Sequence, residues 1–180
     1  MENIVISYSA IHSSIISKWI SPEIDMQMFK PVIMRTDSGN NDFIALVRRL
    51  DEDLAVRDGA EHSFYAQFNS LQTIKNVVIA FENGIPVSCG AFKEFSPNCA
   101  EVKRMYTLPD YRGKGIAALV LAELEQWGKE LSYRSFVLET GKKQPEAIRL
   151  YEKCGYHLIP NYGQYTGIEN SLCFEKQLEK

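Results

Sequence analysis

The chain has 180 residues, of which 45% are hydrophobic and 24% charged, and its formal net charge is −3. These values are typical of a single globular domain with a core of its own, and they exclude a disordered or fibrous chain. The slightly acidic balance also argues against a protein that binds nucleic acid or an anionic membrane surface.

The four cysteines are scattered along the chain and form no CxxC pair; they are Cys89, Cys99, Cys154 and Cys173. Isolated cysteines in apolar stretches are typical of reduced, buried thiols. No window approaches the ~18 apolar residues of a membrane span, and the first residues lack the pattern of a signal peptide. The sequence therefore predicts a cytoplasmic protein.

The elements in the first part of the chain are unevenly defined. Residues 1–30 are rich in Ser and Ile with weak periodicity, and they form either an extra helix packed on the domain or an amino-terminal extension before a single domain over 31–180. The run 31–36 predicts a strand, and Asn41 is a suitable N-cap for a helix that ends at Gly59. One face of that helix is apolar and carries Phe43, Leu46, Val47, Leu50 and Leu54. Aromatic spacing in the next twelve residues predicts a second helix.

The remaining elements follow in a regular order. Asn83-Gly84 separates two β-rich runs, which is a strong hairpin signal, and 101–107 predicts a third strand. Apolar residues recurring from Ile116 to Leu131 predict a helix of about four turns. A strand at 135–139, a helix from Pro145 to a C-cap at Gly155, and two closing strands complete a mixed α+β sheet with helices against it.

The segment "YRGKGIA" at 111–117 precedes the longest predicted helix after the hairpin. Glycines at 113 and 115 permit unusual dihedrals and a close approach to the backbone, while Arg112 and Lys114 add positive charge. Because a helix amino terminus also favours negative charge, the segment predicts a phosphate site.

Two other phosphate motifs fit this segment less well. The P-loop pattern GxxxxGK[ST] is absent, which argues against a nucleoside triphosphatase. Residues 113–118 fit GxGxxA, and Glu139 stands where a ribose-binding acid belongs in a dinucleotide fold. However, residues 108–112 separate the strand from the first glycine, and the preceding strands suggest a hairpin instead of a βαβ unit. An NAD(P)-binding oxidoreductase is therefore the weaker alternative.

Two longer segments carry a family resemblance: "MYTLPDYRGKGIAALVLAELEQWGKE" at 105–130 and "ETGKKQPEAIRLYEKCGYHLI" at 139–159. Together they resemble the acetyl-CoA-binding region of the GCN5-related N-acetyltransferase (GNAT) family, and the likeness covers about 32–180. It implies a GNAT-like acyl-CoA N-acyltransferase fold with a central, mostly antiparallel sheet. It also implies direct acetyl transfer from acetyl-CoA to an amine of a small molecule or a protein amino terminus. A non-catalytic acyl-CoA-binding or sensing module is an alternative.

The resemblance also implies where the cofactor contacts lie. The pantetheine arm would pair with the backbone of the strand that contains Met105, Tyr106 and Thr107. The pyrophosphate would lie on the loop and first helical turn made by Arg112, Gly113, Lys114, Gly115, Ile116, Ala117 and Ala118. Gln144 occupies a position where many relatives have a cofactor-binding asparagine. No metal is expected.

For catalysis, the resemblance assigns Tyr151 the protonation of the departing thiolate. Glu139 aligns with the base of the ribosomal-protein acetyltransferase branch, and Glu101 on the neighbouring strand is a competing carboxylate. Substrate contacts are expected from His62, Tyr65, Tyr162 and Tyr165. The acidic stretch at 49–62 could attract a cationic amine but is more typical of a solvated helix face. The chain is expected to be a monomer or homodimer, with no nucleic-acid or membrane partner.

Overall fold

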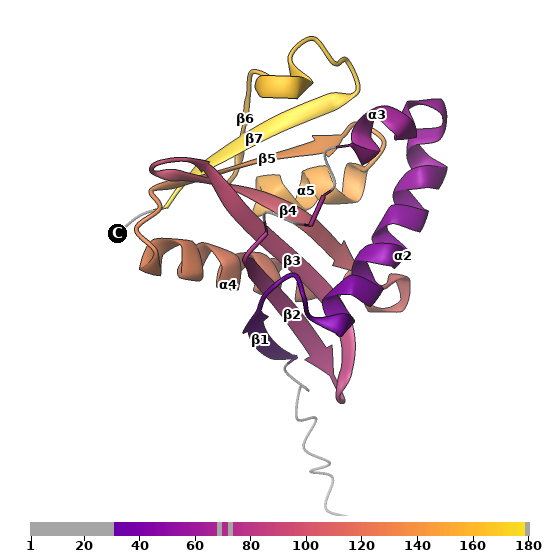
Figure 1. The fold of residues 1–180 in the computed structure, drawn as a ribbon, viewed down its shortest axis with the longest axis vertical. Helices are drawn as coiled ribbons and strands as arrows, with labels where there is room; N and C mark the ends of the chain where they lie inside the picture. Colours follow the sequence, from indigo (N-terminus) through magenta and orange to yellow (C-terminus); the bar gives the residue numbers. More distant parts are fainter. Residues whose placement is uncertain (1–30, 68–69, 72–73, 179–180) are drawn as a thin grey trace, which may run out of the picture. The chain divides into compact units, whose positions relative to one another are not determined.

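The structure is a computed structural model that describes residues 31–67, 70–71 and 74–178 (Figure 1). The predicted extension over 1–30 lies outside these residues. The described part closely follows the predicted order of strands and helices. It also contains no helix with the length and apolar character that a membrane crossing needs.

A seven-stranded sheet forms the centre of the described domain. Its strands are β1 (Val32–Thr36), β2 (Asn76–Glu82), β3 (Ile85–Ser96), β4 (Cys99–Thr107), β5 (Ser135–Gly141), β6 (His157–Ile159) and β7 (Ser171–Gln177). Their spatial order is β1-β2-β3-β4-β5-β7-β6, and among these strands only β4 and β5 pair in parallel. The expected mixed, mostly antiparallel sheet is confirmed.

Helices cover both faces of the sheet (Figure 1). They are α2 (Asn41–Asp58), α3 (His62–Ala66), α4 (Ile116–Glu130) and α5 (Pro145–Lys153), with short 3-10 turns η1 (Gly59–Glu61), η2 (Pro109–Tyr111) and η3 (Gly163–Tyr165). Alternation along β2 separates two cores, because successive side chains of a strand point to opposite faces. Val77 and Ile79 pack with α2, whereas Val78 and Ala80 pack with α4.

The start of α2 corrects one detail of the sequence analysis. The N-cap is Asn40, and Asn41 is the first helical residue. The Asn40 side chain accepts hydrogen bonds from the backbone N–H groups of Asp42 at 2.9 Å and Phe43 at 3.2 Å. The two consecutive asparagines are chemically equivalent as caps, so the sequence alone could not choose between them. Gly59 ends the helix with a positive φ of 58°, as predicted.

The connection through α4 corrects a second expectation. β4, α4 and β5 form a βαβ unit, because β4 pairs in parallel with β5 on one edge while it pairs antiparallel with β3 on the other. The sequence indicates that β3 pairs with β4 through a short connection, but it gives no signal that β5 pairs with the other edge of β4. Since the βαβ unit is present, its expected absence is no longer an argument against dinucleotide binding. The sheet itself still argues against it: only one pair among the seven described strands is parallel, whereas dinucleotide folds are built on mostly parallel sheets.

Gly128 in α4 leads to the first testable prediction. A Cβ added there would lie 2.5 Å from both Cε1 and Cζ of Phe136. Gly to Ala inside a helix ordinarily adds about 1 kcal/mol of stability, but overpacking against a rigid ring costs about 1–3 kcal/mol. We expect Gly128→Ala to lower the midpoint of thermal unfolding. In a Phe136→Leu background, which shortens the opposing side chain, Gly128→Ala should lower the unfolding midpoint less. A higher midpoint for Gly128→Ala alone would contradict the packing of Gly128 against Phe136.

Candidate active site

A pocket lies where β4 and β5 separate. The two strands are paired only from Cys99 to Glu101 and from Ser135 to Val137, so the following halves of both strands have backbone edges that face a gap. The register between β3 and β4 changes a few residues further along β4, between Lys103 and Tyr106, where Arg104 takes a positive φ of 56°. A bulge bends its strand and increases the local twist. An extended ligand could therefore insert between β4 and β5.

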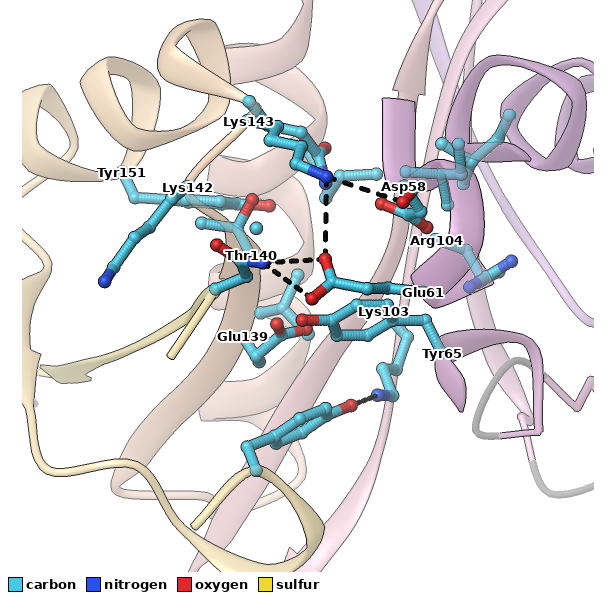
Figure 2. Close-up of a pocket in the computed structure, with 18 residues that line it drawn as sticks. Asp58, Glu61, Tyr65, Lys103, Arg104, Glu139, Thr140, Lys142, Lys143 and Tyr151 are labelled. Carbon is cyan, nitrogen blue, oxygen red and sulfur yellow. Dashed lines mark hydrogen bonds and ion pairs between the residues drawn. The ribbon is translucent and has the colours of Figure 1, made fainter. Parts of the chain in front are cut away.

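Four parts of the chain contribute side chains to this pocket (Figure 2). They are β4 (Val102, Lys103, Arg104, Met105); β5 with its following loop and α5 (Glu139, Thr140, Gly141, Lys142, Lys143, Gln144, Tyr151); the α2–α3 region (Leu50, Leu54, Asp58, Glu61, Tyr65); and the β6–β7 connection (Tyr165, Asn170). Glu139 and Tyr151, both predicted as catalytic, are therefore brought to one cavity.

Glu139 is held by β5 in a mostly buried position. Burial raises the pKa of its carboxyl group to about 7, although a hydrogen bond from Ser171 and the charge of Lys103 oppose that shift. The Tyr65 hydroxyl lies 3.2 Å from Ser171 Oγ. Because Ser171 donates to the carboxylate, Tyr65 can donate to Ser171. Glu139 Oε1 is buried and has no hydrogen-bond partner among the described residues. Such a group can exchange a proton near neutral pH with a polar ligand in the pocket.

Tyr151 projects from α5 into the same pocket and is only 6% exposed. Burial first, and then the charge of Glu139, raise the pKa of its phenol far above the ordinary value of 10. The hydroxyl group therefore keeps its proton throughout the neutral range. Its ring is fixed at an angle of 63° to the ring of Tyr156, with 5.8 Å between centroids.

Glu101, the competing carboxylate, lies outside the residues that line the pocket. It is 2% exposed. Lys93 lies 3.4 Å from one of its oxygens and Lys103 lies 3.2 Å from the other, which also accepts a hydrogen bond from Tyr162 at 3.0 Å. These donors occupy both oxygens. The geometry thus gives Glu139 better access to a ligand than Glu101.

The glycine-rich loop has the features that a phosphate group requires. Gly113 and Gly115 have positive φ values of 77° and 81°, and Gly115 is the N-cap of α4. No side chain of the described residues caps that helix. The first-turn N–H groups, those of Ile116, Ala117 and Ala118, have no intrahelical acceptors and are available to an anion. Lys114 lies with its ammonium 4.7 Å from the Tyr111 ring centroid.

Arg112 has a more fixed position than the sequence indicates. Its Nε donates to the Thr107 carbonyl at 2.9 Å, and its Nη2 lies 2.9 Å from Asp53 Oδ2. Arg112 therefore joins the loop to β4 and α2, and part of its charge is already balanced by Asp53.

Of the other predicted cofactor contacts, two line the pocket and two do not. Met105 and Gln144 line the pocket, and Gln144 is also the N-cap of α5. Tyr106 and Thr107 are each 8% exposed and do not line it. The Thr107 hydroxyl lies 2.7 Å from that of Ser88. These two side chains therefore belong to the interior, whereas their strand edge remains available.

Of the predicted substrate contacts, Tyr65 and Tyr165 line the pocket. The Tyr165 hydroxyl accepts a hydrogen bond from Lys103 at 3.2 Å. Tyr162 is not brought to the pocket, since its hydroxyl group points to Glu101 and its ring packs on Phe95. His62 begins α3, but its side chain lies outside what the structure describes.

At one side of the pocket is a polar cluster that sequence reasoning missed. Glu61 accepts hydrogen bonds from Asn170 Nδ2 at 2.8 and 2.7 Å, and Lys143 Nζ lies 3.5 Å from it (Figure 2). Lys143 also donates to the backbone carbonyl of Asp58 at 3.4 Å. The sequence displays only the acidic stretch that contains Asp58 and Glu61, because more than 80 residues separate each partner from that stretch.

Comparison with known proteins assigns the chain that carries this site to a family. The sequence matches the acetyltransferase (GNAT) family over residues 44–156, which is more than half of the chain. The chain belongs to the GNAT family. This membership favours the acetyltransferase interpretation of the glycine loop over the dinucleotide one.

Two curated relatives support the assignment of this GNAT protein. It is 30% identical over 137 residues to an IAA acetyltransferase of Azospirillum brasilense, a match that covers 75% of this chain and 90% of the relative. It is 35% identical over 100 residues to an uncharacterized N-acetyltransferase of Schizosaccharomyces pombe. That second match covers 55% of this chain and spans 61% of the yeast protein.

Solved structures show the same GNAT fold. A Klebsiella pneumoniae protein assigned as an acyl-CoA N-acyltransferase superposes with a TM-score of 0.70 and 28% identity, covering 83% of this chain and 98% of that one. The PaiA N-acetyltransferase of Thermoplasma acidophilum, in complex with coenzyme A, gives a TM-score of 0.61 with 18% identity and covers 82% and 99% of the two chains.

Proposed function

We propose that this protein binds acetyl-CoA between β4 and β5 and passes the acetyl group directly to an amine. Glu139 acts as the base and Tyr151 as the hydrogen-bond and proton donor. The observation that carries the proposal is the meeting of these two side chains in one pocket, at the point where the two parallel strands separate. Family membership supports the reaction class, and the pocket supports the roles.

The loop and strand edge suit the co-substrate. The unpaired edges of β4 and β5 beyond Glu101 and Val137 can accept an extended amide-containing arm by β-type hydrogen bonds. The uncapped amino terminus of α4, with glycines at 113 and 115, suits a pyrophosphate. Acetyl-CoA bound there supplies a thioester whose acetyl carbon is open to attack by a nitrogen.

The acid–base groups account for the protons of the reaction. A protonated amine must lose two protons as its nitrogen forms the C–N bond and the C–S bond breaks. Glu139 accepts one proton and passes it to solvent. Tyr151 donates a proton to the departing sulfur and regains the second one released from nitrogen. Burial raises the pKa of the Tyr151 phenol, but the same apolar surroundings raise that of a thiol leaving beside it, so donor and acceptor stay comparable.

The thiols bear on the compartment in which the protein acts. All four cysteines are free, and two of them, Cys89 and Cys173, are buried. This supports activity in a reducing compartment such as the cytoplasm.

Thermal unfolding tests the proposed co-substrate. A ligand present at a hundred times its dissociation constant adds about 2.7 kcal/mol to the stability of the folded state. For a domain of this size the midpoint should rise by about 5–10 °C. We expect that rise with acetyl-CoA and with CoA, and no change with NAD or NADPH at the same concentration. A rise with the nicotinamide nucleotides alone would overturn the proposal.

A further inference from the structure

Lys103 carries a positive charge in the pocket that its neighbours only partly balance. Its side chain is 12% exposed, and its ammonium lies 3.2 Å from Glu101 Oε1. Glu101 is shared, because the Lys93 ammonium lies 3.4 Å from the other oxygen. Two lysines therefore share Glu101, which balances the charge of Lys103 only in part; the other acidic group that this charge reaches in the pocket is Glu139.

The hydrogen-bonding capacity of Lys103 is also incompletely used. An ammonium group has three N–H donors. The Tyr165 hydroxyl accepts one of them, Glu101 forms an ion pair with the ammonium, and the Tyr165 ring lies 5.7 Å from it; among the described residues no other hydrogen-bond acceptor contacts Lys103. A charged donor with little exposure is stabilised when an anion completes its contacts. Lys103 is thus prepared for an anionic group inside the pocket.

The position of Lys103 relative to Glu139 follows from strand register. Glu101 pairs with Val137 at the last rung before β4 and β5 separate. Lys103 and Glu139 each lie two residues further along parallel strands, so they occupy the same level and the same face. Both line the pocket, and the charge of Lys103 acts on the Glu139 carboxyl. A cationic and an acidic group therefore face each other across the opening.

The other cations described in the pocket differ from Lys103. Arg104 is held by Asp51 at 2.7 Å, and Lys143 contacts Glu61 at the polar cluster. The Lys142 side chain is exposed and lies on the loop after β5. Lys103 combines low exposure with a place opposite Glu139.

We propose that the acetyl acceptor is a free amino acid, whose carboxylate binds Lys103 while its amine faces Glu139. This inference rests on the proposed function, because it assigns the amine of that same reaction. The two groups of an amino acid are separated by a single carbon, which matches a cation and a base placed at one level of neighbouring strands. The acetyl carbon leaves the thioester sulfur for the amine nitrogen, and the carboxylate remains unchanged.

Matched acceptors test the inference on the unmodified protein. Each of the twenty protein amino acids is compared with its amide and its decarboxylated amine at saturating acetyl-CoA, with thiol release as the measurement. At least one free amino acid should exceed both counterparts at least tenfold in kcat/KM. Equal or better turnover of the amide, the amine or a peptide amino terminus would overturn the inference, as would the absence of turnover with every amino acid.

Lys103→Met identifies the residue responsible. Loss of a charge-assisted contact should lower kcat/KM for the amino acid about ten- to a hundredfold. The matched amine should change less than about twofold when both proteins are assayed well above pH 7, where Glu139 is ionised with or without the Lys103 charge. Lys93→Met is the control, because it removes the other ion pair of Glu101 without altering the pocket lining. The preference for the carboxylate should persist in Lys93→Met. Equal losses for acid and amine in Lys103→Met would overturn the inference.

Failure of this inference is distinguishable from failure of the proposed function. The same preparations are tested for the rise in unfolding midpoint with acetyl-CoA. A rise together with acetylation of amines lacking a carboxylate retains the acetyltransferase and removes the amino acid. Absence of the rise removes the proposed function itself.

Discussion

Glu139→Gln is expected to lower kcat about 10²- to 10⁴-fold, the usual contribution of a positioned base. Acetyl-CoA should still raise the unfolding midpoint, since the substitution leaves the glycine loop and the strand edges intact. In the parent protein, the rate should rise as pH increases through about 7, because Glu139 must be ionised to accept a proton. The variant should lack this rise.

The phenol groups near Glu139 do not contribute to the pH profile. Facing Glu139 are Ser171, Lys103, Glu101, Asp58, Tyr65, Tyr151 and Tyr165. The pKa values of the three phenols are raised chiefly by burial, so they stay neutral in this range. Using one acceptor for both proteins cancels the titration of the amine itself. If Glu101→Gln removed the rise and Glu139→Gln preserved it, Glu101 would be the base.

Glu139→Gln is also expected to change the stability of the protein. The pKa of Glu139 is about 7 in the folded protein against an ordinary 4.5, so between these values only the folded state holds the proton. Binding of this proton stabilises the folded state. The stabilisation is complete below pH 4.5 and is lost as pH rises through 7. Above pH 7 the Glu139→Gln variant avoids that loss, and its free energy of unfolding should exceed that of the parent by up to ~3 kcal/mol. Urea unfolding at pH 5 and pH 8 measures the difference.

Local chemistry explains which elements could be predicted from the sequence. Asn83 and Gly84 have positive φ values of 53° and 77°, the conformation that the hairpin between β2 and β3 requires and that these residues favour. The apolar period from Ile116 onward correctly predicts α4, because its Val120, Leu121 and Leu124 fill one core. Each of these signals lies within a few residues of the feature that it predicts.

The features that shape the pocket depend on distant partners. Nothing in the run 101–107 indicates that β4 separates from β5 after Glu101, because that outcome depends on register with both β3 and β5. Glu61 meets Asn170 across 109 residues of sequence. In the sequence, Lys103 is one polar residue of an alternating strand. Its importance follows only from its place opposite Glu139 in the structure. Tyr162 does not line the pocket for the same reason, since its ring contacts Phe95 and its hydroxyl donates to Glu101, both distant in the sequence.

Tyr151→Phe is expected to lower kcat by about 10²-fold or more while leaving the KM for acetyl-CoA nearly unchanged. The hydroxyl group would contact the sulfur only as negative charge develops there, so its loss affects the transition state and not the bound ground state. The ring, which packs against Phe174 and Tyr156, is retained and preserves the fold. Initial rates at varied acetyl-CoA measure both constants.

Tyr156→Phe is the matched control for this prediction. Tyr156 is 4% exposed, contacts the Tyr151 ring from outside the pocket, and has a buried hydroxyl that lies near Glu125. Removing that hydroxyl should leave kcat within about twofold, because Tyr156 lies outside the pocket and its hydroxyl contacts no reacting atom. Similar losses in both variants would indicate that the tyrosines act only by packing. A loss confined to Tyr151→Phe, with acetyl-CoA affinity intact, would instead require a hydroxyl that acts on the departing sulfur.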